Sequence, residues 1–189
     1  NVIPQVTSVI DFSPGGQSEL WDPPDKTLCA EIAKSHRDGV SVTIFNPSTQ
    51  MSLFLALMSQ TEERHGRKPK YPPRFWQALA ELAFADDRIR WLCVQHDGRL
   101  AAVHIFIIDR DSALNWQIYF DKEYSALKPN QAISWYEANQ FRTEGVRYLN
   151  LGATPADASG VETYKQKWGG TDYRYRVLSH RSLLGRLIW

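Results

Sequence analysis

The sequence predicts an α+β fold, with a mixed, largely antiparallel sheet and helices on both faces. Two observations carry this prediction. The spacing of apolar residues changes repeatedly between the period of a helix and that of a strand, and three strand-like segments in the middle of the chain follow one another through short turns, which join antiparallel strands. The composition of the 189 residues, 43% hydrophobic and 23% charged, is typical of a globular domain and excludes disordered and fibrous classes.

The N-terminal third alternates strand and helix. Residues 6–12 are rich in β-branched side chains and end at a Pro-Gly-Gly cluster, which predicts a strand. A helix is expected over residues 25–36, where the apolar positions have helical spacing, and a strand over 40–45. Ser48 is expected to cap the next helix, which runs to the charged end at Arg64.

The middle third contains the antiparallel strands. Pro72 and Pro73 are expected to open a helix, because proline is favoured in a first helical turn. Asp97-Gly98 separates two apolar segments, and these residue types readily adopt the left-handed conformations of a tight hairpin turn. The three predicted strands are residues 91–95, 100–108 and 113–120.

The C-terminal third returns to alternating elements. Pro129 is expected to open a long helix that ends at Gly145, since glycine commonly ends helices. The remaining expected elements are a strand at 146–151, a short helix at 160–168 and a strand at 173–178. The basic and apolar tail at 181–189 is interpreted either as a packed terminus or as a homodimer contact.

Charge and cysteine usage exclude several function classes. Lys and Arg total 22 against 21 for Asp and Glu, so no overall field attracts nucleic acid or an anionic membrane. Cys29 and Cys93 are expected to be buried thiols of a reducing compartment. The five histidines show no metal-ligand spacing, so no metal is expected. The chain lacks an apolar run long enough for a membrane span and a signal pattern, which predicts a soluble, cytoplasmic protein.

Two segments near the C-terminal end carry the most specific pattern. The segment 145–152 ends in a hydrophobic-polar-hydrophobic-Gly motif, and 160–169 follows it with a Gly, the pair Tyr164-Lys165 and the pair Trp168-Gly169. Together with segments 71–76 and 97–102, this pattern resembles the GNAT superfamily of acyltransferases, and within it the Fem-type (FemAB-like) peptidyl transferases and related acetyltransferase domains.

The resemblance implies a division of the chain. Residues 40–189 are expected to form a GNAT-like acyltransferase domain. Residues 1–39 are expected to be an N-terminal strand-helix extension, the remnant of a preceding half-domain.

The resemblance also implies a donor site between two strands that move apart, residues 116–119 and 148–151. The donor's phosphates would lie at the start of the helix opened by Pro129, because free N–H groups and the helix dipole favour anions there. The residues expected to bind the donor are Lys128, Asn130, Gln131 and Asn150. The donor is acyl-CoA or aminoacyl-tRNA, and the missing Gly pair of CoA-binding members leaves both open.

The catalytic roles that the resemblance implies fall on two residues. Tyr164 is either the general acid that protonates the leaving group or a core aromatic, and Lys165 is expected to stabilise negative charge at the reacting carbonyl or on an acceptor phosphate. Lys167 is a further candidate for substrate binding, or a surface charge. Trp116, Tyr119 and Trp135 are expected to line the acceptor cleft.

The function that the resemblance implies is N-acyl transfer: an acyl or aminoacyl group moves to an amine on a small molecule or a cell-envelope precursor. The basic loop 64–70 and Arg174, Arg176 and Arg181 are candidates for phosphate contacts, for example with tRNA. The alternative is a non-catalytic, ligand-binding half of a two-domain transferase.

Overall fold

A computed structural model describes residues 2–13, 20–154 and 159–178, and it confirms the α+β prediction. These residues form a seven-stranded sheet in the order β2-β3-β4-β5-β6-β1-β7, in which β5 and β6 are parallel and the other neighbours antiparallel. The strands are β1 (Val2–Asp11), β2 (Val42–Ile44), β3 (Ile89–His96), β4 (Arg99–Asp109), β5 (Ser112–Phe120), β6 (Tyr148–Thr154) and β7 (Thr171–Leu178). The helices are α1 (Lys26–Arg37), α2 (Pro47–Arg64), α3 (Pro73–Ala85), the 3-10 helix η1 (Lys122–Leu127), α4 (Pro129–Thr143) and α5 (Ser159–Lys167).

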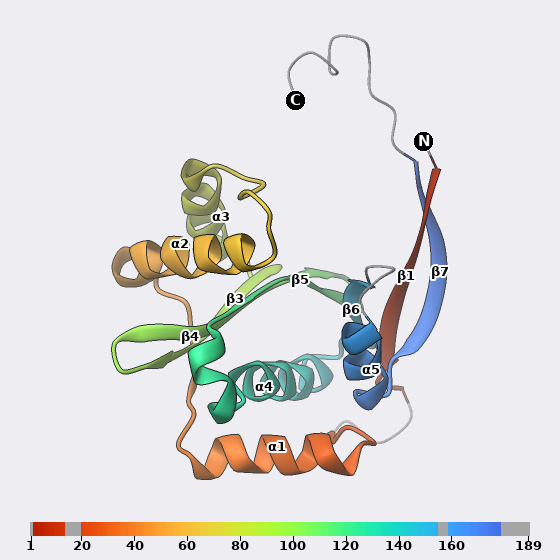
Figure 1. The fold of residues 1–189 in the computed structure, drawn as a ribbon. Helices are drawn as coiled ribbons and strands as arrows, with labels where there is room; N and C mark the ends of the chain where they lie inside the picture. Colours follow the sequence, from red (N-terminus) through yellow and green to blue (C-terminus); the bar gives the residue numbers. More distant parts are fainter. Residues whose placement is uncertain (1, 14–19, 155–158, 179–189) are drawn as a thin grey trace.

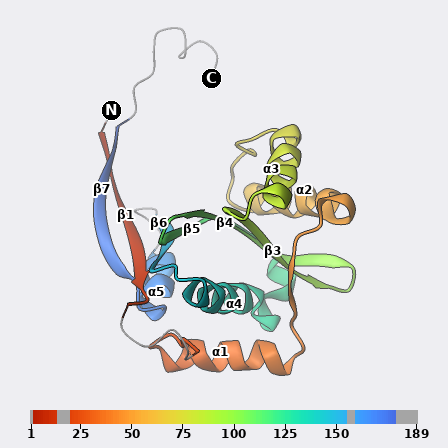
Figure 2. The ribbon, with the colours of Figure 1, turned by 180° about the vertical axis from the view of Figure 1, so that it is seen from behind.

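The helices cover both faces of the sheet, as the sequence predicts. Figure 1 shows α2 and α3 on one face and α4 on the other, and Figure 2 shows the same layers from behind. Helix α1 lies on the side of α4 that is away from the sheet. Helix α4 therefore lies between α1 and the sheet.

Strand β1 is an inner strand. It pairs with β6 on one side and with β7 on the other, although these two strands lie far from it in the sequence. The strand of the N-terminal segment 1–39 thus belongs to the same sheet as the segment that follows it, and joins β7 to the rest of the sheet.

The helix starts agree with the sequence, with one correction. Asp25 caps α1 by accepting a hydrogen bond from the Leu28 N–H, and prolines open α3 and α4. The predicted cap at Ser48 is wrong, because Asn46 accepts the Ser48 N–H at 3.0 Å and Pro47 already occupies the first turn of α2. An asparagine before a proline is itself a strong start signal.

The strand bounds differ at the C-terminal end. The strand predicted at 146–151 begins at Tyr148 and continues to Thr154, because β1 pairs with it as far as Thr154. The Arg147 and Tyr148 N–H groups both donate to the Asp111 carbonyl, so the contact with the β5 segment begins at this point and Val146 lies before the strand. The tail at 181–189, and with it the expected homodimer contact, lies outside the described residues.

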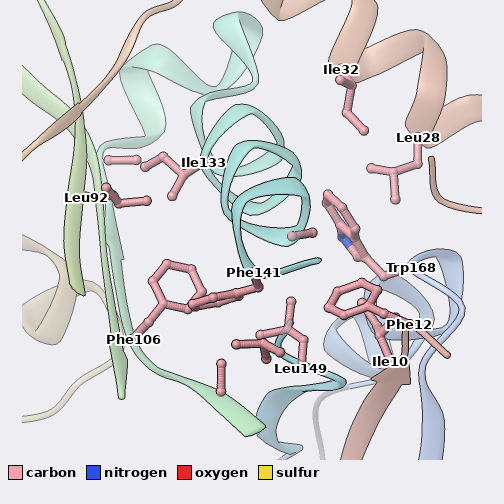
Figure 3. Close-up of a cluster of buried hydrophobic side chains, with 14 of the residues drawn as sticks. Ile10, Phe12, Leu28, Ile32, Leu92, Phe106, Ile133, Phe141, Leu149 and Trp168 are labelled. Atoms are coloured by element: carbon pink, nitrogen blue, oxygen red, sulfur yellow. The ribbon is translucent and has the colours of Figure 1, made fainter. Parts of the chain in front are cut away.

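Two hydrophobic clusters fix the layers. The larger one lies between the sheet and α1, α4 and α5; Figure 3 shows Phe106 and Phe141 packed together in it and Trp168 beside Phe12. The other lies under α2 and α3, where Phe54 makes edge contacts with Trp76 and Trp91. Burying each large apolar side chain stabilises the fold by about 1.5–3 kcal/mol. The two clusters therefore hold the helices against the two faces of the sheet.

Candidate active site

Strands β5 and β6 form a fork. They pair in parallel over three residue pairs, from Ser112 with Tyr148 to Leu114 with Asn150, and then separate. At the point of separation β5 contains a bulge opposite β4, since Phe106 pairs with Asn115 but Ile105 pairs with Gln117. Trp116 is the extra residue. A bulge of this kind leaves the backbone of the extra residue unpaired with the neighbouring strand and changes the direction of nearby side chains. The gap expected between these two strands is therefore present.

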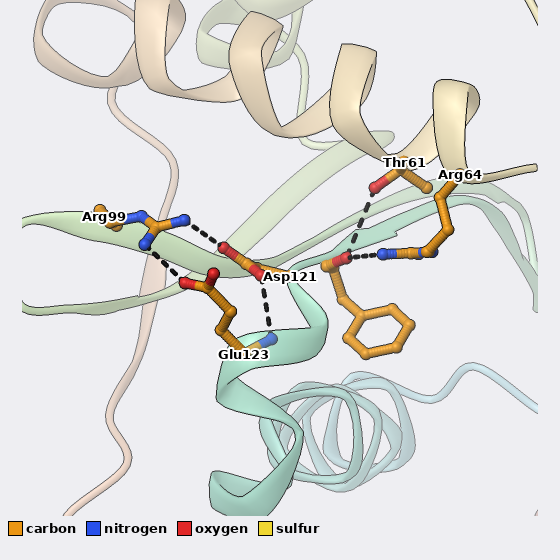
Figure 4. Close-up of polar contacts among 6 residues, drawn as sticks. Thr61, Arg64, Arg99, Asp121 and Glu123 are labelled. Carbon is orange, nitrogen blue, oxygen red and sulfur yellow. Dashed lines mark hydrogen bonds and ion pairs between the residues drawn. The ribbon is translucent and has the colours of Figure 1, made fainter.

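Contacts at the far end of β5 hold it away from β6. Figure 4 shows the Phe120 carbonyl accepting hydrogen bonds from Thr61 at 3.4 Å and Arg64 at 3.1 Å, both on α2. The next residue, Asp121, forms an ion pair with Arg99 at 2.6 Å. Strand β6 is meanwhile held by β1 on its other side, so the two arms of the fork have separate anchors.

A cavity of about 430 Å³ lies at the fork. It is called the fork groove below, and it is lined by Thr7, Leu114, Asn115, Trp116, Asn150, Gly152, Ala153 and Tyr175. None of these eight residues is an Asp, Glu, Lys, Arg or His. The groove is therefore walled by neutral polar and apolar groups, and charge reaches it only from neighbouring residues.

The β6 wall of the groove is a hydrogen-bonded turn. Asn150 Oδ1 accepts the Gly152 N–H at 2.8 Å and the Thr7 hydroxyl lies 2.5 Å from the same oxygen. Gly152 has φ +80°, and a Cβ there would lie 3.2 Å from the Asn115 carbonyl oxygen. A side chain at this position would therefore be strained and would narrow the fork.

Lys165 brings a positive charge beside this wall. Its ammonium donates to the Gly152 carbonyl at 2.5 Å and to the Thr154 hydroxyl at 3.0 Å, and the residue is 4% exposed. Burial lowers the pKa of Lys165 to about 8, partly opposed by the Asp172 carboxylate. An ammonium has three N–H donors, and the third has no partner among the described residues. Lys165 is thus a cation that contacts a groove residue directly, with one N–H donor that no described residue accepts.

Tyr164 faces the other way. It packs against Trp168 and the larger hydrophobic cluster, with ring centroids 6.0 Å apart, and it is not among the groove-lining residues. Burial raises the pKa of Tyr164 to about 12. Of the expected catalytic pair, the structure therefore brings only Lys165 close to the groove.

The expected donor-binding side chains at the start of α4 already have partners in the chain. Lys128 Nζ forms an ion pair with Glu31 Oε1 on α1 at 2.7 Å, and Gln131 Nε2 donates to Glu31 Oε2 at 3.1 Å. Both oxygens of one carboxylate are thus held where the donor's phosphate was expected. Asn150, the fourth expected donor-binding residue, lines the groove.

Asn130 points into the protein instead. Its Oδ1 lies 3.0 Å from His104 Nε2, and His104 Nδ1 lies 3.2 Å from Asn115 Nδ2. His104 is fully buried, and burial lowers its pKa to about 4. A chain of neutral polar side chains therefore links the first turn of α4 to the base of the fork.

The three aromatic residues expected in one cleft lie in different places. Trp116 lines the groove and also packs against the cluster under α2 and α3, in which Tyr119 is buried; each ring lies 6.0 Å from Trp76. Tyr119 donates its hydroxyl to Gln117 at 3.0 Å. Trp135 lies on the opposite face of the sheet, where it contacts His36 and donates to Asp22. The sheet therefore separates Trp135 from the other two rings, so the three cannot line a single cleft.

The other expected phosphate-binding groups are distributed over the surface. Lys167 is partly exposed on the last turn of α5, and Arg174 and Arg176 are exposed on β7. In the basic loop, Arg67 forms an ion pair with Glu62. Arg181 lies outside the described residues.

The sequence analysis missed Thr7, Glu31, His104 and Asn115. For His104 and Asn115 a signal was present, because each is a polar residue inside an otherwise apolar strand segment, where a buried polar pair is expected to be hydrogen-bonded. For Thr7 and Glu31 no local signal existed, since their partners Asn150 and Lys128 lie 143 and 97 positions away in the sequence.

The sequence matches the family model described as "Acetyltransferase (GNAT) domain" over residues 27–166. The chain belongs to this family. A search of curated proteins finds no match. The GNAT assignment agrees with the resemblance on which the sequence-based expectations rest.

Solved structures with this GNAT fold include two that cover nearly all of the chain. FemX is similar with a TM-score of 0.75 and 12% identity, over 97% of this chain and 63% of FemX. The C-terminal domain of a putative lysylphosphatidylglycerol synthetase from Agrobacterium fabrum has a TM-score of 0.68 and 13% identity, over 93% of this chain and 60% of its own. The PaiA N-acetyltransferase of Thermoplasma acidophilum, solved with coenzyme A, has a TM-score of 0.58 and 12% identity, over 67% of this chain and 87% of its own.

The chain thus spans about three fifths of the length of the first two of these structures. Within the described residues, no helix is both long and apolar enough to cross a bilayer. The same residues contain no cluster of three or more His, Cys, Asp or Glu side chains placed to hold a metal ion.

Proposed function

We propose that the fork groove is the active site of an N-acyltransferase, which moves an acyl or aminoacyl group from a thioester or an aminoacyl ester to an amine. The observation that carries the proposal is the parting of β5 and β6 after three residue pairs, with a groove at the fork and a buried cation beside it. Acyl transfer needs little covalent help from side chains, and depends on orientation and on stabilising the developing oxyanion.

The reaction balances without a metal or an oxidant. The amine nitrogen attacks the acyl carbon and forms the C–N bond, and the C–S bond of a thioester or the C–O bond of an aminoacyl ester breaks. The proton lost by nitrogen ends on the leaving thiol or ribose hydroxyl. Lys165 and the backbone at the Trp116 bulge are the groups placed to meet negative charge on the carbonyl oxygen.

The proposal for the donor class rests on the contacts at the start of α4. PaiA was solved with coenzyme A, but here Lys128 and Gln131 are held by Glu31, and Asn130 by His104. These contacts favour an aminoacyl-tRNA over acyl-CoA as the donor, since a tRNA can bind through phosphates elsewhere. For the acceptor, we propose an amine on a small molecule or a cell-envelope precursor.

The experiment is a donor panel assayed on the chain as it stands. Purified protein is given acetyl-CoA, longer acyl-CoAs and alanyl-, seryl- and lysyl-tRNA, with glycinamide or an amino-terminal peptide as acceptor, and N-acylated product is measured by mass spectrometry. Lys165→Gln is the test variant, and Lys26→Gln on exposed α1 is the matched control. We expect product with at least one donor and a loss of about 100-fold in Lys165→Gln alone.

The same experiment distinguishes acyl transfer from the alternative function. Donor binding without product from any donor, unchanged by Lys165→Gln, would support a non-catalytic, ligand-binding half of a two-domain transferase. That alternative draws support from the chain's span of about three fifths of the FemX structure.

A further inference from the structure

The amide oxygen of Asn115 is a buried acceptor that has no partner in the part of the chain that the structure describes. Asn115 is 6% exposed, and no described residue donates a hydrogen bond to its Oδ1. Asn115 also lines the fork groove, at the bulge where β5 leaves β6. A buried carbonyl left without a hydrogen bond is unfavourable, because it has lost the bond that it would make to water. The unpaired amide oxygen of Asn115 is explained if a molecule bound in the fork groove donates an N–H to it.

Hydrogen bonds with His104 fix the orientation of the Asn115 amide. His104 stays neutral because it is fully buried, and a neutral imidazole has one donor and one acceptor nitrogen. Since the Asn115 amide nitrogen can only donate, His104 Nδ1 accepts it at 3.2 Å, and His104 Nε2–H donates to Asn130 Oδ1 at 3.0 Å. The amide nitrogen of Asn115 is thereby held against His104, and its oxygen is turned away from the ring.

The charges around the groove favour an uncharged amine over an ammonium as the group that donates this N–H. A carboxylate would attract an ammonium and hold its proton, and an ammonium has no lone pair with which to attack a carbonyl. No acidic residue lines the groove, and the ammonium of Lys165, which contacts the groove residue Gly152, disfavours a second positive charge. A neutral amide oxygen can hold one N–H of an uncharged amine and leave its lone pair free.

We propose that Asn115 binds the reacting amine of the substrate in its uncharged form, with His104 and Asn130 as positioning residues that hold the Asn115 amide. This inference rests on the proposed acyl transfer and names the part of that site that receives the nucleophile. It places the acceptor of the amine N–H on β5, next to the bulge whose backbone is proposed to meet the carbonyl oxygen together with Lys165 beside β6.

The kinetic test uses Asn115→Leu, which keeps the size of the side chain and removes the acceptor. With glycinamide as the amine and whichever donor gives product, kcat/KM for the amine is expected to fall about tenfold, while the KM of the donor stays within about twofold of wild type. His104→Leu is expected to cause a smaller fall in the same constant. The control is His96→Asn, at the exposed end of the β3–β4 hairpin, which is expected to change neither.

The binding test needs no turnover and no variant. The side-chain NH₂ signals of 15N-labelled wild-type protein are followed by NMR during titration with glycinamide at about pH 9, where its amine is uncharged. N,N-dimethylglycinamide, which has the same carboxamide but no N–H on the uncharged amine, is the matched probe. The Asn115 signals are expected to shift with glycinamide and not with the dimethyl compound, also if Asn115→Leu fails to fold.

Each outcome has one meaning. The inference is overturned if the two probes shift the Asn115 signals alike or not at all, or if folded Asn115→Leu keeps its kcat/KM for the amine within about twofold. If no donor gives product but glycinamide alone shifts the Asn115 signals, the amine site stands and the proposed transfer fails.

Discussion

Two lysines, expected from the sequence to meet negative charge, lie in opposite electrostatic surroundings. Lys128 at the start of α4 is 29% exposed and is paired with the Glu31 carboxylate at 2.7 Å. Lys165 on α5 is 4% exposed, and its partners are the neutral oxygens of Gly152 and Thr154. A cation that already has a carboxylate must lose it before it can bind a ligand anion, whereas an unmatched cation is available to one.

The unmatched cation has a physical cost. Moving an ammonium out of water is unfavourable, and burial lowers the pKa of Lys165 to about 8 for this reason. The same low dielectric strengthens its attraction to a negative charge that develops nearby. A residue that destabilises the fold but strengthens such an attraction is typical of a functional site.

The largest expected effect that separates the two lysines is on the pH profile of transfer. Because the pKa of Lys165 is lowered to about 8, the fraction of ammonium falls about tenfold for each pH unit above that value, and the rate with a fully uncharged amine is expected to fall with it. Lys165→Arg keeps its charge at high pH and is expected to remove this decline. Initial rates between about pH 7 and 10 measure it.

The matched control for that profile is Lys128→Arg, which is expected to leave the decline where it is in wild type. A decline that stays in folded, active Lys165→Arg, or that disappears in Lys128→Arg, would assign the ionisation to another group and remove the contrast between the two lysines.

How far the sequence predicts this contrast depends on the range of each contact. The Asp97-Gly98 turn is local, and both residues have the positive φ that a tight hairpin turn requires, 49° and 74°. Lys165 was found through a short motif within one helix. The Lys128–Glu31 pair joins residues 97 positions apart, and the place of β1 between β6 and β7 joins the two ends of the chain. Periodicity contains no information about either contact.

The fork shows the same limit on a smaller scale. The sequence and its resemblance predict that residues 113–120 form a strand and that it parts from the next one, and both predictions are confirmed. The bulge at Trp116 shifts the alternation of side chains within that strand. For this reason Trp116 and Tyr119, three residues apart, both pack against the cluster under α2 and α3, whereas a regular strand would place them on opposite faces.

A smaller effect is expected on stability, with the opposite sign to that on activity. Lys165→Met removes a buried charge, so the free energy of unfolding is expected to rise at about pH 7, by about 1 kcal/mol or 2–4 °C in Tm. The pKa of Lys165 is lower in the folded than in the unfolded chain, so wild-type stability rises with pH from about 8 to the ordinary lysine value near 10.5. The advantage of Lys165→Met is therefore expected to shrink over this range, as measured by thermal unfolding.

The opposite result is expected for Lys128→Met, which leaves Glu31 without its ion-pair partner and lowers Tm slightly. If Lys165→Met also lowers Tm at about pH 7, the Lys165 ammonium stabilises the fold, and its burial is no sign of function.

The smallest expected effect is on anion binding at the start of α4, and it is best measured as a double-mutant cycle. Glu31→Gln removes the carboxylate that holds Lys128 and Gln131, so coenzyme A or inorganic pyrophosphate is expected to bind severalfold more tightly. Lys128→Ala is expected to change binding little in wild type but to reverse the gain in the Glu31→Gln background, because Lys128 is available to a ligand only there. Isothermal titration calorimetry measures all four proteins. If Lys128→Ala weakens binding equally in both backgrounds, the ligand displaces Glu31 without difficulty, and Lys128 is as available to an anion as Lys165.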